Sequence, residues 1–325
     1  MKVLVTGAAG YIGSVVAERL IEKGHTVVAF DNLQEGNRKA VHPDAVFVYG
    51  DVCDRGALMS AFAAHRPDAV VHLAAMVVVD ESVRDPGLHY RTNLCGGINL
   101  LDAMVAFGCP TLVFSSTAAV YGEPEVVPIS EEARQNPVNP YGETKLQFER
   151  ALAWYRNAHG IRHVSLRYFN ACGATARYGE SRRKETHIIP LLFEVALGHR
   201  ERFSLFGSDY PTHDGTCVRD YVHVADIADA HIAALAKAEH LGGSAFNLGS
   251  GTGYSNLEVI EAVRKVTGHP VPYELAPRRP GDPAALVASN DKAKSQLGWQ
   301  PSFTGLEAMV ETAWVWRREH PNGYV

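Results

Sequence analysis

Tyr141 and Lys145 are the residues that most directly suggest chemistry, because they place a phenol and an ammonium four positions apart. Asn139 and Pro140 precede them, which predicts a helix with Asn139 as its N-cap and Pro140 as its first residue. Residues i and i+4 share a helix face, so both side chains can point into one cleft. For a phenol to act as a base at neutral pH, its pKa must fall by roughly three units, which requires about 4 kcal/mol. A nearby cation in a partly desolvated site is a source of that energy.

A hydroxyl partner for this pair is Thr117, which closes the run Ser115-Ser116-Thr117 at the end of a predicted strand. Open α/β sheets bind their ligands at the carboxyl ends of strands. The Thr117 hydroxyl could therefore share a proton with a substrate alcohol and with Tyr141. Taken alone, each feature has a plainer interpretation: a threonine that finishes a strand, and a tyrosine beside a solvated lysine on a helix surface.

The run Gly7-Ala8-Ala9-Gly10-Tyr11-Ile12-Gly13 lies between the first predicted strand and the first predicted helix. Glycines there allow a tight turn and a close backbone approach, and a helix amino terminus favours the charge of a pyrophosphate. The spacing differs from the commoner Gly-x-Gly-x-x-Gly, and a simple tight turn is the alternative. Asp31 ends the second predicted strand, where a carboxylate accepts hydrogen bonds from a ribose and repels a 2′-phosphate. The pattern therefore favours NAD over NADP.

Short apolar runs alternate with helical patterns through the first half of the chain, which predicts a doubly wound parallel sheet covered on both faces. Six strands are expected at 3–6, 26–30, 46–49, 69–73, 111–115 and 163–168. Helices are expected near 12–23, 54–64, 87–107, 140–158, 187–198, 224–237, 255–267 and 303–318. Residues 171–186 read as a loop. We expect a Rossmann-type nucleotide-binding domain over 1–170 and a smaller α/β substrate domain over 171–325, with 218–248 folding back onto the first.

Bulk composition excludes several classes of function. The 325 residues carry 31 basic and 36 acidic side chains without like-charged runs, which predicts no nucleic-acid or membrane surface. Five scattered cysteines lack Cys-x-x-Cys spacing, which argues against a metal site or a disulfide framework. No apolar run approaches the ~18 residues that span a bilayer, and Gly7 interrupts the amino terminus too early for a signal peptide. We expect a cytoplasmic protein.

Together the motifs resemble those of the extended short-chain dehydrogenase/reductase family, the NAD-dependent epimerases and dehydratases, and within it the UDP-sugar 4-epimerases. The resemblance runs nearly end to end. It rests on Thr6-Gly7-x-x-Gly10-Tyr11-Ile12-Gly13, Asp31-Asn32-Leu33, Gly50-Asp51, Ser115-Ser116-Thr117, Val120-Tyr121-Gly122, Tyr141-x-x-x-Lys145, Arg167-Tyr168-Phe169-Asn170, Val218-Arg219-Asp220-Tyr221-x-His223-Val224, Asn247-Leu248-Gly249 and Arg278-Arg279-x-Gly281-Asp282.

The resemblance implies a set of site residues, with Tyr141, Lys145 and Thr117 as the catalytic group. Residues implied to bind NAD are Gly7, Gly10, Tyr11, Ile12, Gly13, Asp31, Asn32, Leu33, Asp51, Val52, Leu73, Ala74, Ala75, Thr92, Ser115, Tyr141, Lys145 and Tyr168. Residues implied to bind a UDP-sugar are Thr117, Tyr141, Asn170, His187, Phe206, Arg219, Tyr221, Arg279, Asp282 and Leu286. The two arginines suit a doubly charged diphosphate.

The implied reaction interconverts UDP-glucose and UDP-galactose through a 4-keto sugar, with Tyr141 handling the proton of the C4 hydroxyl and NAD the hydride. The chain departs from the family pattern at several positions. Val77 stands where many relatives carry lysine, Thr92 replaces the first residue of an Asn-Asn pair, and Thr117 replaces serine. His187 replaces an asparagine, and Leu286 occupies the position that gates bulk at the sugar's C2.

Three alternatives remain. A nucleotide-sugar dehydratase needs an acid–base pair after Thr117, where this chain has Ala118-Ala119. A 4-epimerase of another UDP-sugar (N-acetylhexosamine, pentose or uronate) fits the same motifs. A non-catalytic nucleotide sensor would generally lack the pair Tyr141 and Lys145. By family analogy alone, helices near 92–107 and 145–158 are expected to pair with their copies in a homodimer.

Overall fold

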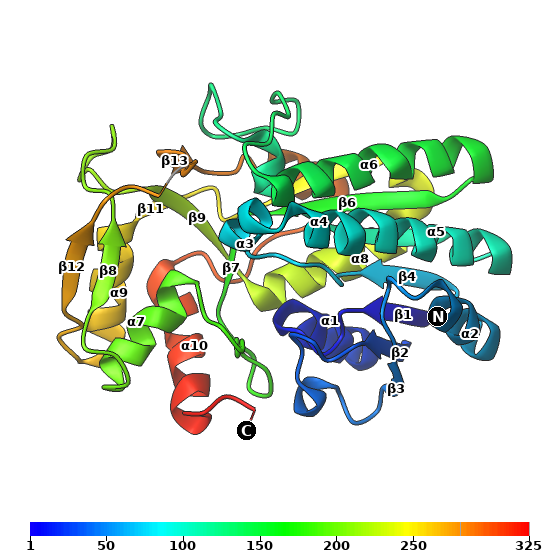
Figure 1. The fold of residues 1–325 in the computed structure, drawn as a ribbon, viewed down its shortest axis with the longest axis horizontal. Coiled ribbons are helices and arrows are strands. Elements are labelled where there is room, and N and C mark those ends of the chain that lie inside the picture. The colour runs from blue at the N-terminus through cyan, green and yellow to red at the C-terminus, as the bar shows by residue number, and fades with distance from the viewer. Residues whose placement is uncertain (280, 325) are drawn as a thin grey trace.

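The structure, a computed structural model, describes residues 1–279 and 281–324. Its main element is a seven-stranded sheet in the order β10-β6-β5-β4-β1-β2-β3, in which every pair is parallel (Figure 1). The strands are β1 (Lys2–Thr6), β2 (Thr26–Asp31), β3 (Val46–Tyr49), β4 (Ala69–His72), β5 (Thr111–Thr117), β6 (Arg162–Tyr168) and β10 (Ser244–Leu248). The predicted Rossmann-type sheet and its six strands are confirmed, and β10 adds a seventh at the edge.

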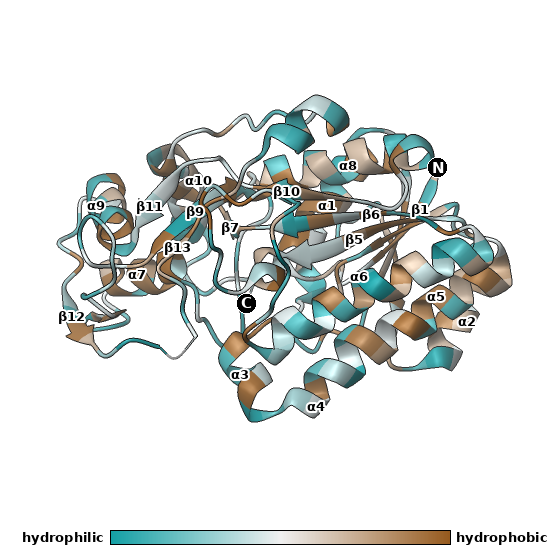
Figure 2. Cartoon of the chain, turned by 90° about the horizontal axis from the view of Figure 1, so that it is seen from above, coloured by the Kyte–Doolittle hydropathy of each residue, from teal (hydrophilic) through white to brown (hydrophobic). Residues whose placement is uncertain are grey.

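Both faces of this sheet are buried, because alternate residues of a strand point to opposite sides. Val3 and Val5 belong to one apolar core and Leu4 to the other, and all three are fully buried. The first core includes α1 (Tyr11–Glu22) and α8 (Val224–Leu241). The second includes α2 (Arg55–His65), α5 (Gly96–Phe107) and α6 (Pro140–His159). Hydrophobic and hydrophilic residues alternate along α5 and α6, as expected for helices with one buried face (Figure 2).

Smaller sheets and three helices form a second group of elements to one side of the main sheet (Figure 1). In a four-stranded sheet β9 pairs with β7, β11 and β13, and β8 pairs with β12. Helices α7, α9 and α10 share their own apolar core. The bounds are β7 (Asn170–Cys172), α7 (Ile188–Ala196), β8 (Phe203–Phe206), β9 (Val218–His223), β11 (Gly253–Ser255), α9 (Asn256–Thr267), β12 (Tyr273–Ala276), β13 (Ala285–Leu286) and α10 (Leu306–Glu319). The division into two domains at residue 170 stays our proposal.

Local sequence signals set several helix ends as predicted. The Asn139 side chain accepts a hydrogen bond from the Gly142 amide, and Pro140 is the first residue of α6. Ser255 and Glu258 form a reciprocal capping box at α9. The helix predicted over 87–107 is present, but it contains a π-helical turn that the sequence did not indicate. It comprises α4 (Pro86–His89), a π-helical turn η2 (Tyr90–Cys95) and α5, and it follows a short unpredicted helix α3 (Val79–Arg84).

The remaining short elements are 3₁₀ turns η1 (Arg38–Ala40) and η3 (Ala118–Tyr121) and a second π-helical turn η4 (Ala293–Leu297). The segment expected to be a loop from residue 171 begins instead inside strand β7, because Asn170–Cys172 pairs with β9. Within the described residues, no helix is both long and apolar enough to cross a membrane.

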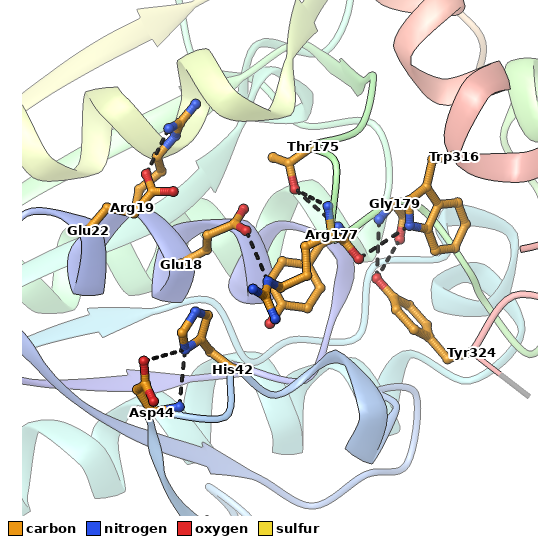
Figure 3. Close-up of polar contacts among 11 residues, drawn as sticks. Glu18, Arg19, Glu22, His42, Asp44, Thr175, Arg177, Gly179, Trp316 and Tyr324 are labelled. Carbon is orange, nitrogen blue, oxygen red and sulfur yellow. Dashed lines mark hydrogen bonds and ion pairs between the residues drawn. The ribbon is translucent and has the colours of Figure 1, made fainter. Parts of the chain in front are cut away.

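Polar contacts near the carboxyl end of the chain connect α10 with α1, which packs on the main sheet (Figure 3). The Tyr324 hydroxyl donates to the Gly179 carbonyl at 3.1 Å, and the Gly179 amide lies 3.1 Å from the same hydroxyl. The Trp316 indole donates to the Arg177 carbonyl at 3.3 Å, and the Arg177 guanidinium lies 3.6 Å from Glu18 on α1. These contacts hold the segment that follows β7 against both groups of elements.

A buried ion pair fixes α6 against the sheet. Arg167 on β6 donates to the Glu149 carboxylate at 3.0 and 2.6 Å, and their side chains are only 4% and 10% exposed. The Ser116 hydroxyl on β5 also donates to Glu149. The third guanidinium nitrogen donates to Tyr121 at 2.8 Å, and Tyr121 donates to Asn247 on β10 at 2.8 Å. Every charged group is therefore hydrogen-bonded, as burial demands.

We expect Glu149→Leu to lower the free energy of unfolding by about 3–5 kcal/mol, because it leaves the Arg167 charge buried without a partner. The midpoint of urea unfolding measures the effect. Glu307→Gln is the matched control, since Glu307 pairs with Lys265 at 2.7 Å on the surface, where side chains are 54% and 69% exposed. That change should alter stability by less than about 1 kcal/mol. Equal midpoints for the two variants would contradict the proposed weight of the buried pair.

Candidate active site

The glycine turn between β1 and α1 is shaped for a phosphate group. Gly7 has φ +71°, and a Cβ at that position would lie 2.7 Å from the Ala74 nitrogen. A Cβ on Gly13 would lie 2.0 Å from the Gly7 carbonyl oxygen. The N-cap of α1 is Gly10, which offers no side-chain cap, so the first amides of the helix stay available to an anion. A dinucleotide pyrophosphate fits this turn.

Asp31 stands at the end of β2, as predicted, but its carboxylate already accepts two backbone hydrogen bonds. They come from the Ala9 amide at 3.0 Å and the Leu33 amide at 2.7 Å. Burial raises the pKa of Asp31, and these two bonds oppose the shift. Leu33 itself adopts φ +58°, which is uncommon for a leucine. A left-handed backbone conformation at a non-glycine residue is strained, and such conformations cluster at functional sites. The turn at Leu33 is therefore consistent with a functional role.

The side chains predicted around the adenosine lie close together. The Asn32 amide donates to the Asp51 carboxylate at 2.9 Å, and Asp51 also accepts from the Cys53 amide at 2.7 Å. Thr92 lies 4.0 Å from the Cys53 sulfur, so it borders this cluster through Cys53. Neighbouring Val52 is buried.

The hydroxyl of Tyr11 is committed elsewhere. It donates to the Gly173 carbonyl at 2.6 Å, across the molecule from α1 to the segment after β7. Its backbone amide, with that of Ile12, remains at the start of α1. Leu73, Ala74 and Ala75 follow β4, and the Ala74 amide donates to the Thr6 hydroxyl at 3.3 Å.

Tyr141, Lys145 and Thr117 meet where α6 begins beside the end of β5. The Lys145 ammonium donates to the Ser115 carbonyl at 2.7 Å and lies 4.9 Å from the centre of the Phe114 ring. Burial lowers the pKa of Lys145 to about 7, although the Glu149 charge opposes the shift. The Thr117 oxygen accepts from the Ala119 amide at 3.1 Å. Its own proton is therefore free to serve the Tyr141 oxygen.

The electrostatics of Tyr141 differ from the sequence prediction. Burial raises the pKa of Tyr141, and a hydrogen bond from Thr117 and the charge of Arg182 only partly oppose it. The charges that act on the pKa of Tyr141 do not include that of Lys145, whose ammonium donates to the Ser115 carbonyl. The polypeptide alone therefore holds Tyr141 as a neutral phenol. A further positive charge in the cleft is needed to favour the phenolate.

The residues predicted to bind a diphosphate lie in the second group of elements. Arg219 on β9 donates to the Val218 and Pro283 carbonyls at 2.9 Å each, and its guanidinium lies 3.5 Å from Asp282. Leu286 pairs in register with Arg219.

The other predicted arginine, Arg279, stacks 4.1 Å from the centre of the Phe206 ring. One face of the Phe206 ring is therefore covered by the Arg279 guanidinium. Tyr221 is 3% exposed, and Asn170 donates to the Asp220 carbonyl at 3.1 Å. Both residues come from the paired strands β7 and β9.

His187, the N-cap of α7, lies in an ion-pair cluster that the sequence did not suggest. Its Nδ1 is 3.1 Å from both Glu180 and Glu185, and Arg182 donates to Glu180 at 2.8 Å. Desolvation disfavours the charged imidazole, but the two carboxylates outweigh it and raise the pKa of His187 to about 9. Glu180, Glu185 and His187 could geometrically hold a cation. The Arg182 guanidinium already supplies positive charge there, and the absence of a metal stays an expectation.

Comparison with known proteins places this geometry among nucleotide-sugar enzymes. The sequence model described as the NAD dependent epimerase/dehydratase family matches residues 3–249. The UDP-glucose 4-epimerase of Halalkalibacterium halodurans is 50% identical, over 100% of this chain and 98% of that protein. A crystal structure of a UDP-glucose 4-epimerase matches with a TM-score of 0.97 at 46% identity, covering 100% of both chains. The Bifidobacterium longum enzyme, crystallised with NAD+ and UDP, matches with a TM-score of 0.94 at 37% identity, covering 99% and 100%.

In protein freed of any bound nucleotide, we expect Tyr141 to stay neutral at pH values up to and above its ordinary pKa of about 10. The reason is that burial disfavours the phenolate and so raises the pKa of Tyr141. Ultraviolet difference titration of cofactor-free wild type against Tyr141→Phe measures this group alone. Saturating NAD should move the difference signal to lower pH. A tyrosinate signal near neutral pH in the cofactor-free protein would contradict the prediction.

Proposed function

The chain belongs to the NAD dependent epimerase/dehydratase family, and on that premise we propose that it is an NAD-dependent 4-epimerase that interconverts UDP-glucose and UDP-galactose. The observation that carries the proposal is that Tyr141 and Lys145, at the start of α6, lie beside Ser115 and Thr117 at the carboxyl end of β5. Other UDP-glucose 4-epimerases match this chain over nearly their full length and are about as similar to it as the H. halodurans enzyme, which supports the same reaction.

The cofactor fits the residues present. Gly7 and Gly13 leave room that a side chain would fill, and the uncapped start of α1 suits the pyrophosphate. Asp31 at the end of β2 suits an unphosphorylated ribose. NAD, when bound, takes up the hydride of the sugar's C4 and returns it to the other face. We assign the nicotinamide end to Lys145 and Tyr168.

Tyr141 is assigned the proton of the C4 hydroxyl. Its oxygen receives that proton when the alcohol is oxidised and returns it when the 4-keto sugar is reduced. Thr117 donates to the Tyr141 oxygen and so stabilises the phenolate form. Because its own oxygen is held by the Ala119 amide, Thr117 can present its proton in only a few directions.

Arg219 and Arg279 are assigned to the diphosphate, with Phe206 beside the uracil and Asp282 at the uridine ribose. Arg219 is fixed in advance by two carbonyl groups, so little side-chain freedom is lost on binding. A firmly held diphosphate leaves the sugar as the only part of the ligand that must turn.

A second candidate function is that of a 4-epimerase acting on another UDP-sugar. The residue that supports this candidate is Leu286. Leu286 is partly buried beside Arg219, and its side chain is of intermediate size. A dehydratase is disfavoured because the residues after Thr117 are Ala118 and Ala119, which form the turn η3 and carry no acid or base. A non-catalytic sensor is disfavoured by the buried Tyr141–Lys145 face.

Purified protein should convert UDP-galactose to UDP-glucose without steady release of reduced nicotinamide, as measured by product assay and absorbance. Tyr141→Phe should lower kcat by at least about 100-fold, the usual scale for loss of a general acid–base, while UDP affinity changes little. Calorimetry with UDP is the control measurement. Loss of UDP binding in that variant would show that Tyr141 is structural instead.

Comparison of kcat/KM for UDP-galactose, UDP-N-acetylgalactosamine and UDP-arabinose tests the choice of sugar. We expect UDP-galactose to be preferred. Because a methylene-sized change in a pocket is worth roughly 10–200-fold, Leu286→Ser should raise the relative kcat/KM for the N-acetylated sugar within that range. Preference of the wild type for an N-acetylated sugar or a pentose would move the assignment to the second candidate.

We further propose a homodimer in which α5 and α6 pair with their copies. Trp154 on α6 is 73% exposed, and aromatic side chains are enriched where protein subunits meet. We expect light scattering to give twice the chain mass, and Trp154→Arg to shift the protein toward monomer. A monomeric mass for the wild type would remove the proposal. The cytoplasmic location stays a prediction.

A further inference from the structure

Tyr168 and His231 form a buried hydrogen-bonded pair, and the proposed reaction as described so far gives His231 no role. Tyr168 ends β6 and is 7% exposed, while His231 lies on α8 and is fully buried. The Tyr168 oxygen is 2.6 Å from His231 Nε2. The other ring nitrogen, Nδ1, is 2.9 Å from the Ile227 carbonyl oxygen.

These two contacts determine which way the hydrogen bonds run. A carbonyl oxygen can only accept, so His231 Nδ1 carries the ring proton and donates it to Ile227. Nε2 of the neutral ring is then an acceptor, and the Tyr168 hydroxyl must donate to it. Burial lowers the pKa of His231 to about 4 and raises that of Tyr168, so this arrangement holds across the neutral range.

The Tyr168 oxygen faces the candidate active site with its remaining lone pairs. Tyr168 pairs in register with Thr117 at the ends of β6 and β5. Because side chains alternate along a strand, Ser115 and Thr117 on β5 lie on the same face of the sheet as Tyr168. Ser115, by a hydrogen bond, and Tyr141, by its charge, both act on the pKa of Tyr168. Because its proton is given to His231, this oxygen can only accept hydrogen bonds on the side of the cleft.

We propose that His231 is a positioning residue that makes the Tyr168 oxygen an acceptor toward the Ser115 hydroxyl and toward the carboxamide NH2 of nicotinamide. The inference rests on the proposed function, since it assigns Tyr168 to the nicotinamide end of the cleft. Without an acceptor at His231, the Tyr168 proton turns toward the cleft. There it would meet the carboxamide donor and compete for the oxygen of Tyr141.

Two substitutions at His231 distinguish its role as a hydrogen-bond acceptor for Tyr168 from its role in packing. His231→Gln keeps an acceptor at the distance of Nε2, and His231→Leu removes it. Loss of one buried hydrogen bond corresponds to about tenfold, so we expect His231→Leu to lower both kcat and NAD affinity by about that factor. The KM for UDP-galactose should stay within about twofold, because the hydrogen bonds of His231 are to Tyr168 and Ile227 and none is to a residue assigned to the UDP-sugar diphosphate. His231→Gln should return kcat and NAD affinity to within about threefold of wild type.

The matched control is His163→Leu. His163 lies on β6, is 5% exposed, and neither of its ring nitrogens has a hydrogen-bond partner in the described part of the chain. This variant removes a buried imidazole of the same size and should leave kcat and NAD affinity within about twofold of wild type. Calorimetry on nucleotide-stripped protein gives the affinity for NAD independently of turnover.

A double-mutant cycle with Tyr168→Phe completes the test. If His231 acts through the Tyr168 hydroxyl, His231→Leu has no further effect on kcat or NAD affinity in the Tyr168→Phe background. Additive losses, or equal losses for His231→Leu and His231→Gln, would overturn the inference. Absence of epimerase activity in the wild type would instead count against the proposed function, and the NAD affinities would still judge the role of His231.

Discussion

One face of helix α6 carries three charged or ionisable groups at successive turns, and their burial against β5 constrains the rest of the site. Tyr141, Lys145 and Glu149 are spaced four residues apart, so they share that face. Two of them are held to the sheet by a specific contact: Lys145 donates to the Ser115 carbonyl, and Glu149 accepts from the Arg167 guanidinium. A shift of α6 by one residue would unpair Glu149 and turn Tyr141 out of the cleft. The ion pair thus fixes the position of the candidate base.

The same burial disfavours the ionised form of the candidate base in the protein alone. Desolvation raises the pKa of Tyr141 and lowers that of Lys145, so each group is pushed toward its neutral form. The hydrogen bond from Thr117 offsets only part of the effect on Tyr141. Because an opposite charge nearby favours the phenolate, a cationic nicotinamide in the cleft would complete the base. On the proposed function, proton transfer is therefore coupled to occupancy of the cofactor site, and an empty protein carries no reactive phenolate.

Local patterns in the sequence were sufficient for the sheet and for the cap Asn139, because strand periodicity and capping depend on neighbouring residues. They also located Gly7, whose positive φ follows from the tight turn. They could not give the pairs that hold the site together, since Arg167 is 18 residues from Glu149 and Tyr168 is 63 from His231. The sequence analysis expected a lowered pKa for Tyr141, whereas burial raises it. Local patterns could not indicate this shift, because burial is set by the whole fold.

Rigidity is distributed unequally over the candidate site, and this suits a reaction in which a sugar must present both faces to one ring. Arg219 is held by two carbonyl groups, and Arg279 stacks on Phe206, so both arginines proposed to bind the diphosphate are positioned by contacts within the protein itself. The sugar end has a different character, since Tyr141 offers a hydroxyl group whose proton can redirect without moving heavy atoms. A ligand held firmly by its diphosphate could rotate its sugar there at little cost. The tight contacts would then supply affinity, and the loose ones would permit the change of face that defines a 4-epimerase.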